Sequence, residues 1–211
     1  LPEVVRGINA LMPEAPKHNP DIAVVTIWLY TWFDPAKEAG AAPALIDEGA
    51  DIIVQHTDSP APVQVAENAG VYAFGQASNM SAFGPNAHLV SIVDDWDTYY
   101  VDRVGQVMDG TWTGGDTWWG FTKDGQGGEV GMVALESYNV DAMGEDLVAE
   151  ALALEAALAN GDRHAFPCEG LLKQDGSVPD ECAAGAANLD DWPTLLSMDW
   201  YIQRIEASLP N

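Results

Sequence analysis

The feature that most constrains this fold is a regular alternation of strand-like and helix-like segments. Short runs of β-branched and aromatic residues are expected to form strands at residues 22–33, 51–55, 71–74 and 88–93. Between and after them, segments with helix start and stop signals are expected to form helices at 34–49, 59–70 and 96–108. Strands that alternate with helices of about ten residues predict βαβ units and therefore a parallel sheet flanked by helices, the α/β class.

The remaining segments are less regular. Helical spacing of apolar residues predicts helices at 2–11 and 144–160. A short strand is expected near Trp118–Phe121, and Gln174-Asp175-Gly176 predicts a hairpin turn within 171–178. Residues 190–209 are expected to form one or two terminal helices.

Polar and aromatic residues follow the expected strands directly. In parallel α/β sheets, ligands bind outside the carboxyl ends of the strands. We therefore expect a small-molecule site there, with the candidate residues Trp32, Thr57, Asp58, Gln76 and Asp94. Two alternatives stay open: Trp32 is either a packing residue or a flat platform for a flat ligand, and Asp58 or Ser59 is also a possible cap for the following helix.

The charge balance is extreme, with 33 acidic and 8 basic residues and a formal net charge of -25. Nucleic acids and anionic membranes need clustered Lys and Arg, so neither is an expected partner. The acids are dispersed, which predicts a hydrated acidic surface suited to a salty environment. A neutral or cationic solute fits this charge better than an anionic one.

Catalytic and metal-binding patterns are weak. The chain contains no G-x-S-x-G, P-loop or G-x-G-x-x-G motif after a strand. His56, Asp58, Asp94 and Asp95 offer possible ligands, but their spacing matches no zinc pattern. We expect no catalytic residue, no metal and no cofactor.

The two cysteines, Cys168 and Cys182, flank a loop rich in Gly, Pro and acidic residues. From the sequence alone, two free thiols and a disulfide are both open. An extracytoplasmic location favours the disulfide. A bridge across this loop would contribute about 3 kcal/mol in the chain-entropy model.

Several motifs in fixed order resemble a known family. They are Asp34-Pro35-Ala36-Lys37-Glu38, residues 45–53, 55–62, 70–75, 109–112 and 195–201. Together they resemble the basic membrane protein (BMP/PnrA-like) family of solute-binding lipoproteins, over nearly the whole chain. The resemblance implies a type I periplasmic-binding-protein fold with its N-terminal lobe largely missing. It also implies an extracytoplasmic, membrane-anchored or periplasmic location and delivery of a purine base or nucleoside to an ABC permease.

The resemblance further implies roles for individual positions. Trp32 stands where family members place an aromatic residue that stacks on the base. Nucleoside-binding members have an acid at the Ala77 position and a lysine near Asp94, which favours a free base such as adenine here. The expected division is 1–93 as the C-terminal lobe, 94–165 as a hinge crossing and return segment, and 166–211 as a hairpin and helix. An alternative function is a ligand-sensing domain of a receptor or regulator, although no basic helix-turn-helix is present.

Overall fold

The computed structural model describes residues 2–189 and 191–210. The chain forms two compact units: unit 1 comprises Leu1–Tyr30 and His164–Asn211, and unit 2 comprises Thr31–Arg163. These units group the residues differently from the expected segments 1–93, 94–165 and 166–211. The assignment of those segments to lobes of a larger protein stays a prediction.

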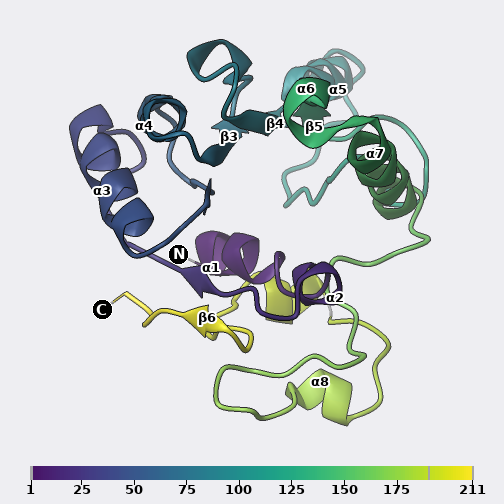
Figure 1. Cartoon of the computed structure of the whole chain (residues 1–211). Helices are drawn as coiled ribbons and strands as arrows, with labels where there is room; N and C mark the ends of the chain where they lie inside the picture. The colour runs from purple at the N-terminus through teal and green to yellow at the C-terminus, as the bar shows by residue number, and fades with distance from the viewer. Residues whose placement is uncertain (1, 190, 211) are drawn as a thin grey trace. The chain divides into compact units, whose positions relative to one another are not determined.

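Unit 2 is built on a four-stranded sheet in the order β2-β3-β4-β5 (Figure 1). Strands β2 (Ile52–Ile53), β3 (Tyr72–Ala77) and β4 (His88–Asp94) are parallel, whereas β5 (Val133–Glu136) runs antiparallel to β4. The sheet is therefore mainly parallel and flanked by helices, which confirms the predicted α/β class. Its carboxyl edge collects the ends of β2, β3 and β4.

Helices α3 (Pro35–Asp47) and α4 (Ala61–Ala69) follow the expected start and stop signals. The side chain of Asp34 caps α3 by accepting a hydrogen bond from the Lys37 backbone N–H at 3.1 Å. Gly70 ends α4 with φ +74°, a left-handed conformation that glycine adopts without strain. Val63 and Ala66 of α4 pack in the core of the unit with Ile53, Ala73, Met80 and Ala87.

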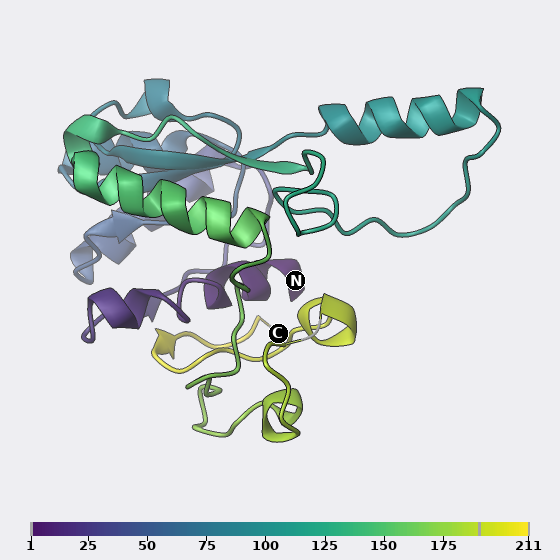
Figure 2. The ribbon, with the colours of Figure 1, turned by 90° about the vertical axis from the view of Figure 1, so that its right-hand side faces the viewer.

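The rest of unit 2 comprises η1 (Ser81–Phe83), α5 (Asp97–Met108), α6 (Val140–Met143) and α7 (Glu145–Ala159). Figure 2 shows α5 extending away from the end of the sheet, and the chain returning through a long loop to β5. The strand expected at Trp118–Phe121 is wrong: the loop instead makes an isolated bridge between Thr122 and Val130. The glycines of this loop allow an irregular backbone path, so contacts between side chains, rather than a regular ladder, hold the loop on α5.

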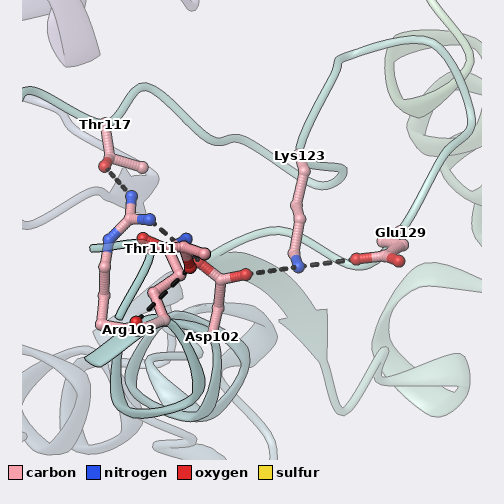
Figure 3. Close-up of polar contacts among 7 residues, drawn as sticks. Asp102, Arg103, Thr111, Thr117, Lys123 and Glu129 are labelled. Carbon is pink, nitrogen blue, oxygen red and sulfur yellow. Dashed lines mark hydrogen bonds and ion pairs between the residues drawn. The ribbon is translucent and has the colours of Figure 1, made fainter. Parts of the chain in front are cut away.

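Charged side chains of α5 and of the loop form a network that makes that attachment (Figure 3), and the Trp119 ring adds further contacts. Asp102 pairs with Arg103 at 2.9 Å and with Lys123 at 3.8 Å, and Lys123 also pairs with Glu129 at 2.6 Å. The Arg103 and Lys123 cations lie 5.4 and 4.8 Å from the centre of the Trp119 ring. Two of the eight basic residues of this acidic chain therefore serve to fix one loop.

Unit 1 is held together by pairing between the two ends of its discontinuous chain. It contains α1 (Pro2–Asn9), α2 (Ala15–His18), β1 (Val24–Val25), α8 (Asp180–Ala183), η2 (Asp191–Leu195) and β6 (Ile205–Glu206). Strand β1 pairs with β6 in parallel. The core of the unit is apolar: Val5, Met12, Phe166, Leu171, Leu189, Leu195, Met198, Tyr201, Ile202 and Ile205.

Two sequence predictions are wrong over most of their length. The long strand expected at 22–33 is limited to Val24–Val25, because its ladder partner β6 has two residues and Tyr30 turns the backbone to φ +55°. Of the one or two terminal helices expected at 190–209, the short helix η2 is present at 191–195, residue 190 lies outside the described residues, and residues 196–209 are not helical. Backbone groups of this last segment bond to distant segments instead, as in Gln203 N–H to Leu172 O at 3.0 Å and Ile202 N–H to Asn9 Oδ1 at 2.9 Å.

The turn expected within 171–178 is present. The Lys173 N–H donates to Ser177 O at 2.8 Å, and the Gly176 N–H donates back to Lys173 O at 2.8 Å. The turn continues into an isolated bridge between Lys173 and Ile202 rather than a regular hairpin ladder.

Cys168 and Cys182 are joined by a disulfide, 14 residues apart in sequence. We expect freshly isolated protein to carry this bridge, so alkylation without reductant should leave its intact mass unchanged. After reduction, alkylation should add two groups. Replacing both cysteines by serine should lower the free energy of unfolding by about 3 kcal/mol. Two alkylated thiols in unreduced protein would contradict the prediction.

Candidate functional site

The candidate site lies at the carboxyl edge of the unit 2 sheet. Strand β2 leads into residues 55–59, β3 ends at Ala77, and β4 ends at Asp94. Four of the five predicted residues, Thr57, Asp58, Gln76 and Asp94, stand at or just after these strand ends. Neighbouring parallel strands bring their carboxyl ends to one edge, which is why residues far apart in sequence meet here.

The backbone position of Trp32 differs from the sequence prediction, which placed this residue at the end of a strand of the sheet. It does not follow a strand of this sheet, because β1 ends at Val25 and belongs to unit 1. Its backbone carbonyl instead accepts a hydrogen bond from the Asp58 N–H at 2.9 Å. The side chain is 54% exposed, so the core of the unit leaves much of the ring uncovered.

The imidazole of His56 lies beside the Trp32 ring, with the ring centres 6.0 Å apart and the planes tilted by 57°. This contact supports one part of the indole and leaves the remainder accessible. An accessible indole face next to polar groups can stack on a flat ligand.

The segment Thr57–Ser59 is fixed by two buried side chains that the sequence analysis did not select. The Gln55 amide donates to the carbonyls of Thr57 and Ser59 at 2.7 and 2.8 Å. The Glu38 carboxylate accepts from the hydroxyls of Thr57 and Ser59 at 2.8 and 2.6 Å. The segment is therefore held from both sides, while the Asp58 side chain in its middle is exposed.

The residue at the N-cap of α4 is Pro60, which forms no side-chain cap, so neither Asp58 nor Ser59 occupies the capping position. The Ser59 hydroxyl nevertheless accepts a hydrogen bond from the Ala61 N–H at 3.3 Å, at the start of α4. The Asp58 side chain is exposed, as a carboxylate that meets a ligand must be.

Asp58, Asp94 and His56 interact electrostatically. The pKa of the Asp94 carboxyl is raised above its usual value, first because the surrounding protein partly desolvates it and second because the Asp58 charge is near; His56 opposes this shift. An N–H donor from a ligand would stabilise both carboxylates. The site therefore offers acceptors beside an aromatic face.

Gln76 and Ala77 complete the carboxyl edge on β3. Gln76 is half-buried opposite Ile92 of β4, two residues before Asp94. Ala77 adopts φ +62°, a left-handed conformation uncommon for residues other than glycine. Such backbone strain often accompanies binding sites.

Within the described residues, no group of three or more His, Cys, Asp or Glu side chains is arranged to hold a metal ion. None of the helices in residues 2–189 and 191–210 has the length and apolar character needed to cross a bilayer.

Comparison with known proteins identifies the family. Residues 5–154 match the family described as ABC transporter substrate-binding protein PnrA-like. The chain belongs to this family, which comprises substrate-binding proteins rather than enzymes.

Two curated relatives extend the comparison. The chain is 43% identical over its full length to a purine-binding protein of Brucella abortus (strain 2308), of which it covers 56%. It is 39% identical over 71% of its length to a Haloferax volcanii protein, provisionally named as an ABC transporter glucose-binding protein, of which it covers 37%. The chain thus spans about half the length of the curated relatives it matches, or less.

Two solved structures share the fold. An ABC transporter solute-binding protein from Conexibacter woesei superposes with a TM-score of 0.58 at 22% identity, over 78% of this chain and 53% of that one. A transcriptional activator from Bacillus halodurans superposes with a TM-score of 0.54 at 18% identity, over 64% of this chain and 46% of that one.

Proposed function

We propose that this chain is part of an extracytoplasmic solute-binding subunit of an ABC importer and that its ligand is a purine base of the adenine type. Family membership supports the importer role, and the purine-binding relative, similar along the whole chain, supports the ligand class. A membrane anchor and delivery to an ABC permease belong to the same proposal.

The observation that carries the ligand assignment is the accessible Trp32 ring, which contacts His56, while the Asp94 carboxylate interacts electrostatically with Asp58 and with the same His56. A flat heteroaromatic base would stack on the indole. Adenine carries an exocyclic amino group and a ring N–H, and each is a donor suited to a carboxylate acceptor. Thr57 and Gln76 are the further polar groups that we assign to the ligand.

The residues at positions 77 and 94 favour a free base over a nucleoside. Ala77 has no side-chain acceptor for ribose hydroxyls, and Asp94 is not a donor as a lysine would be. A buried hydroxyl without a partner costs about 1–3 kcal/mol.

We expect the full-length protein to bind adenine at least about tenfold more tightly than adenosine, because 1.4 kcal/mol corresponds to one decade in affinity. Isothermal titration calorimetry with adenine, adenosine and glucose would measure this. Equal affinity for adenine and adenosine would remove the argument from Ala77 and Asp94. Binding of glucose alone would overturn the purine assignment.

A further inference from the structure

A buried carboxylate lies behind the candidate site. Glu38 in the first turn of α3 is only 1% exposed. Its Oε1 accepts from the Asp34 N–H at 2.8 Å, and its Oε2 accepts from the hydroxyls of Thr57 and Ser59. All three donors are uncharged. A buried carboxylate is costly unless such hydrogen bonds compensate it, so this geometry is closely specified.

Hydrogen bonds to Glu38 connect two segments that lie apart in sequence. One segment carries Trp32 and Asp34, and the other is Thr57–Ser59 with Asp58 in the middle. The bonds from Thr57 and Ser59 to Glu38 cross between the two segments, and the backbone hydrogen bond from Asp58 N–H to Trp32 O is the third link between them. Neither Trp32 nor Asp34 belongs to a strand, so no ladder of the sheet fixes their position.

The position of Glu38 on α3 also stabilises its charge. The amino end of a helix carries a partial positive charge and favours acidic side chains. Asp34 accepts from Lys37 N–H while Glu38 accepts from Asp34 N–H, an exchange similar to a capping box. The start of α3 and the Thr57–Ser59 segment are thus locked by the same carboxylate.

Resting on the proposed function, we propose that Glu38 is a positioning residue of the ligand site: without touching the ligand, it sets the spacing between the Trp32 ring and the Asp58 carboxylate. A flat ligand must meet both at once, so a small change in their separation weakens binding. Pre-organisation of this kind reduces the conformational entropy that the protein would otherwise lose on binding the ligand.

The test is Glu38→Gln in the full-length protein, which keeps the size of the side chain but replaces one acceptor by a donor. We expect the dissociation constant for adenine to rise about tenfold, the equivalent of one lost hydrogen bond to a charged group. In a Trp32→Ala background, the same substitution should have a much smaller effect, because coupled residues are not additive. Additive effects of the two substitutions would overturn the proposal.

The matched control is Glu67→Gln. Glu67 accepts hydrogen bonds from the backbone N–H groups of Asn86 and Ala87 at 2.9 and 2.8 Å, just before the amino end of β4. The substitution should lower the free energy of unfolding without changing the affinity for adenine. An equal loss of affinity in this control would reduce Glu38 to a general stabilising residue. Ser59→Ala removes a single donor to Glu38 and gives a milder variant should Glu38→Gln fail to fold.

A second readout needs no ligand. In the ligand-free protein, Glu38→Gln should accelerate hydrogen exchange of the Asp58 amide about tenfold, because the hydrogen bond to Trp32 O opens more often. Exchange of the amides within the strands of the sheet should be unaffected. If the wild-type protein does not bind adenine, the purine assignment fails, yet the exchange rate still decides the role of Glu38. An unchanged Asp58 rate would overturn it.

Discussion

Replacing Trp32 by alanine is expected to weaken adenine binding to the full-length protein by about ten- to a hundredfold. The indole is 54% exposed and is supported by His56, so removing it deletes the stacking surface without opening the core. Trp32→Phe retains an aromatic face of smaller area and should lose less. Calorimetric titration of the three proteins would give the ranking.

The control is Trp112→Ala. Trp112 is exposed to a similar degree, 53%, but follows α5, where its backbone N–H donates to Gln106 O at 3.1 Å. Its removal should leave adenine affinity unchanged. Should Trp32→Ala bind as tightly as the wild type, the residue would return to a packing role and the stacking proposal would fail.

The second large effect is expected for Gly75→Ala, which should lower the free energy of unfolding by about 2–4 kcal/mol. A Cβ at this position of β3 would overlap the Ser91 hydroxyl and lie 2.9 Å from Ser91 Cβ and 3.1 Å from Met80 Cβ. The Ser91 hydroxyl cannot rotate away freely, because it accepts from Met80 N–H at 3.0 Å and bonds His88 Nε2 at 2.7 Å.

Gly40→Ala is the matched control. Gly40 lies on the exposed side of α3, and a Cβ there meets no atom within 4 Å. Alanine should therefore stabilise the helix by about 0.5–1 kcal/mol. Urea unfolding followed by circular dichroism would compare the variants. A Gly75→Ala protein as stable as the wild type would contradict the close packing of β3 against β4.

The three parallel strands of the unit 2 sheet were predictable because their signals are local, whereas the antiparallel strand β5 (Val133–Glu136) was not predicted. Asp34 and the proline after it mark the start of α3, and Gly70 marks the end of α4, so β2 could be placed between the two helices and β3 directly after α4. The carboxyl-edge rule then selected Thr57, Asp58, Gln76 and Asp94 without knowledge of any contact. Whether these residues bind the ligand stays a prediction.

Other features depend on contacts between distant residues, and the sequence did not reveal them. Residues 26–33 have the composition of a strand, but strand formation needs a partner, and β6 provides only two residues. Residues 195–202 have apolar residues that fit a helix, but Asn9 binds their backbone in an irregular path. The sequence predicts that Glu38 lies in the first turn of a capped helix, a position where acidic side chains are usually exposed to solvent. Its burial follows from the hydroxyls of Thr57 and Ser59, which only the folded chain brings to it.

The pairing of Val24 with Ile205 has a consequence for how the molecule is made. The ribosome completes all of residues 31–163 before it reaches the segment that closes unit 1. During that interval, α1 and the strand at Val24–Val25 lack the 164–211 segment against which they pack in the folded chain, whereas unit 2 is continuous in sequence. Long-range closure of this kind is slow, because the entropy of joining distant segments must be overcome before their contacts form. We therefore expect unit 1 to complete its fold later than unit 2 during synthesis.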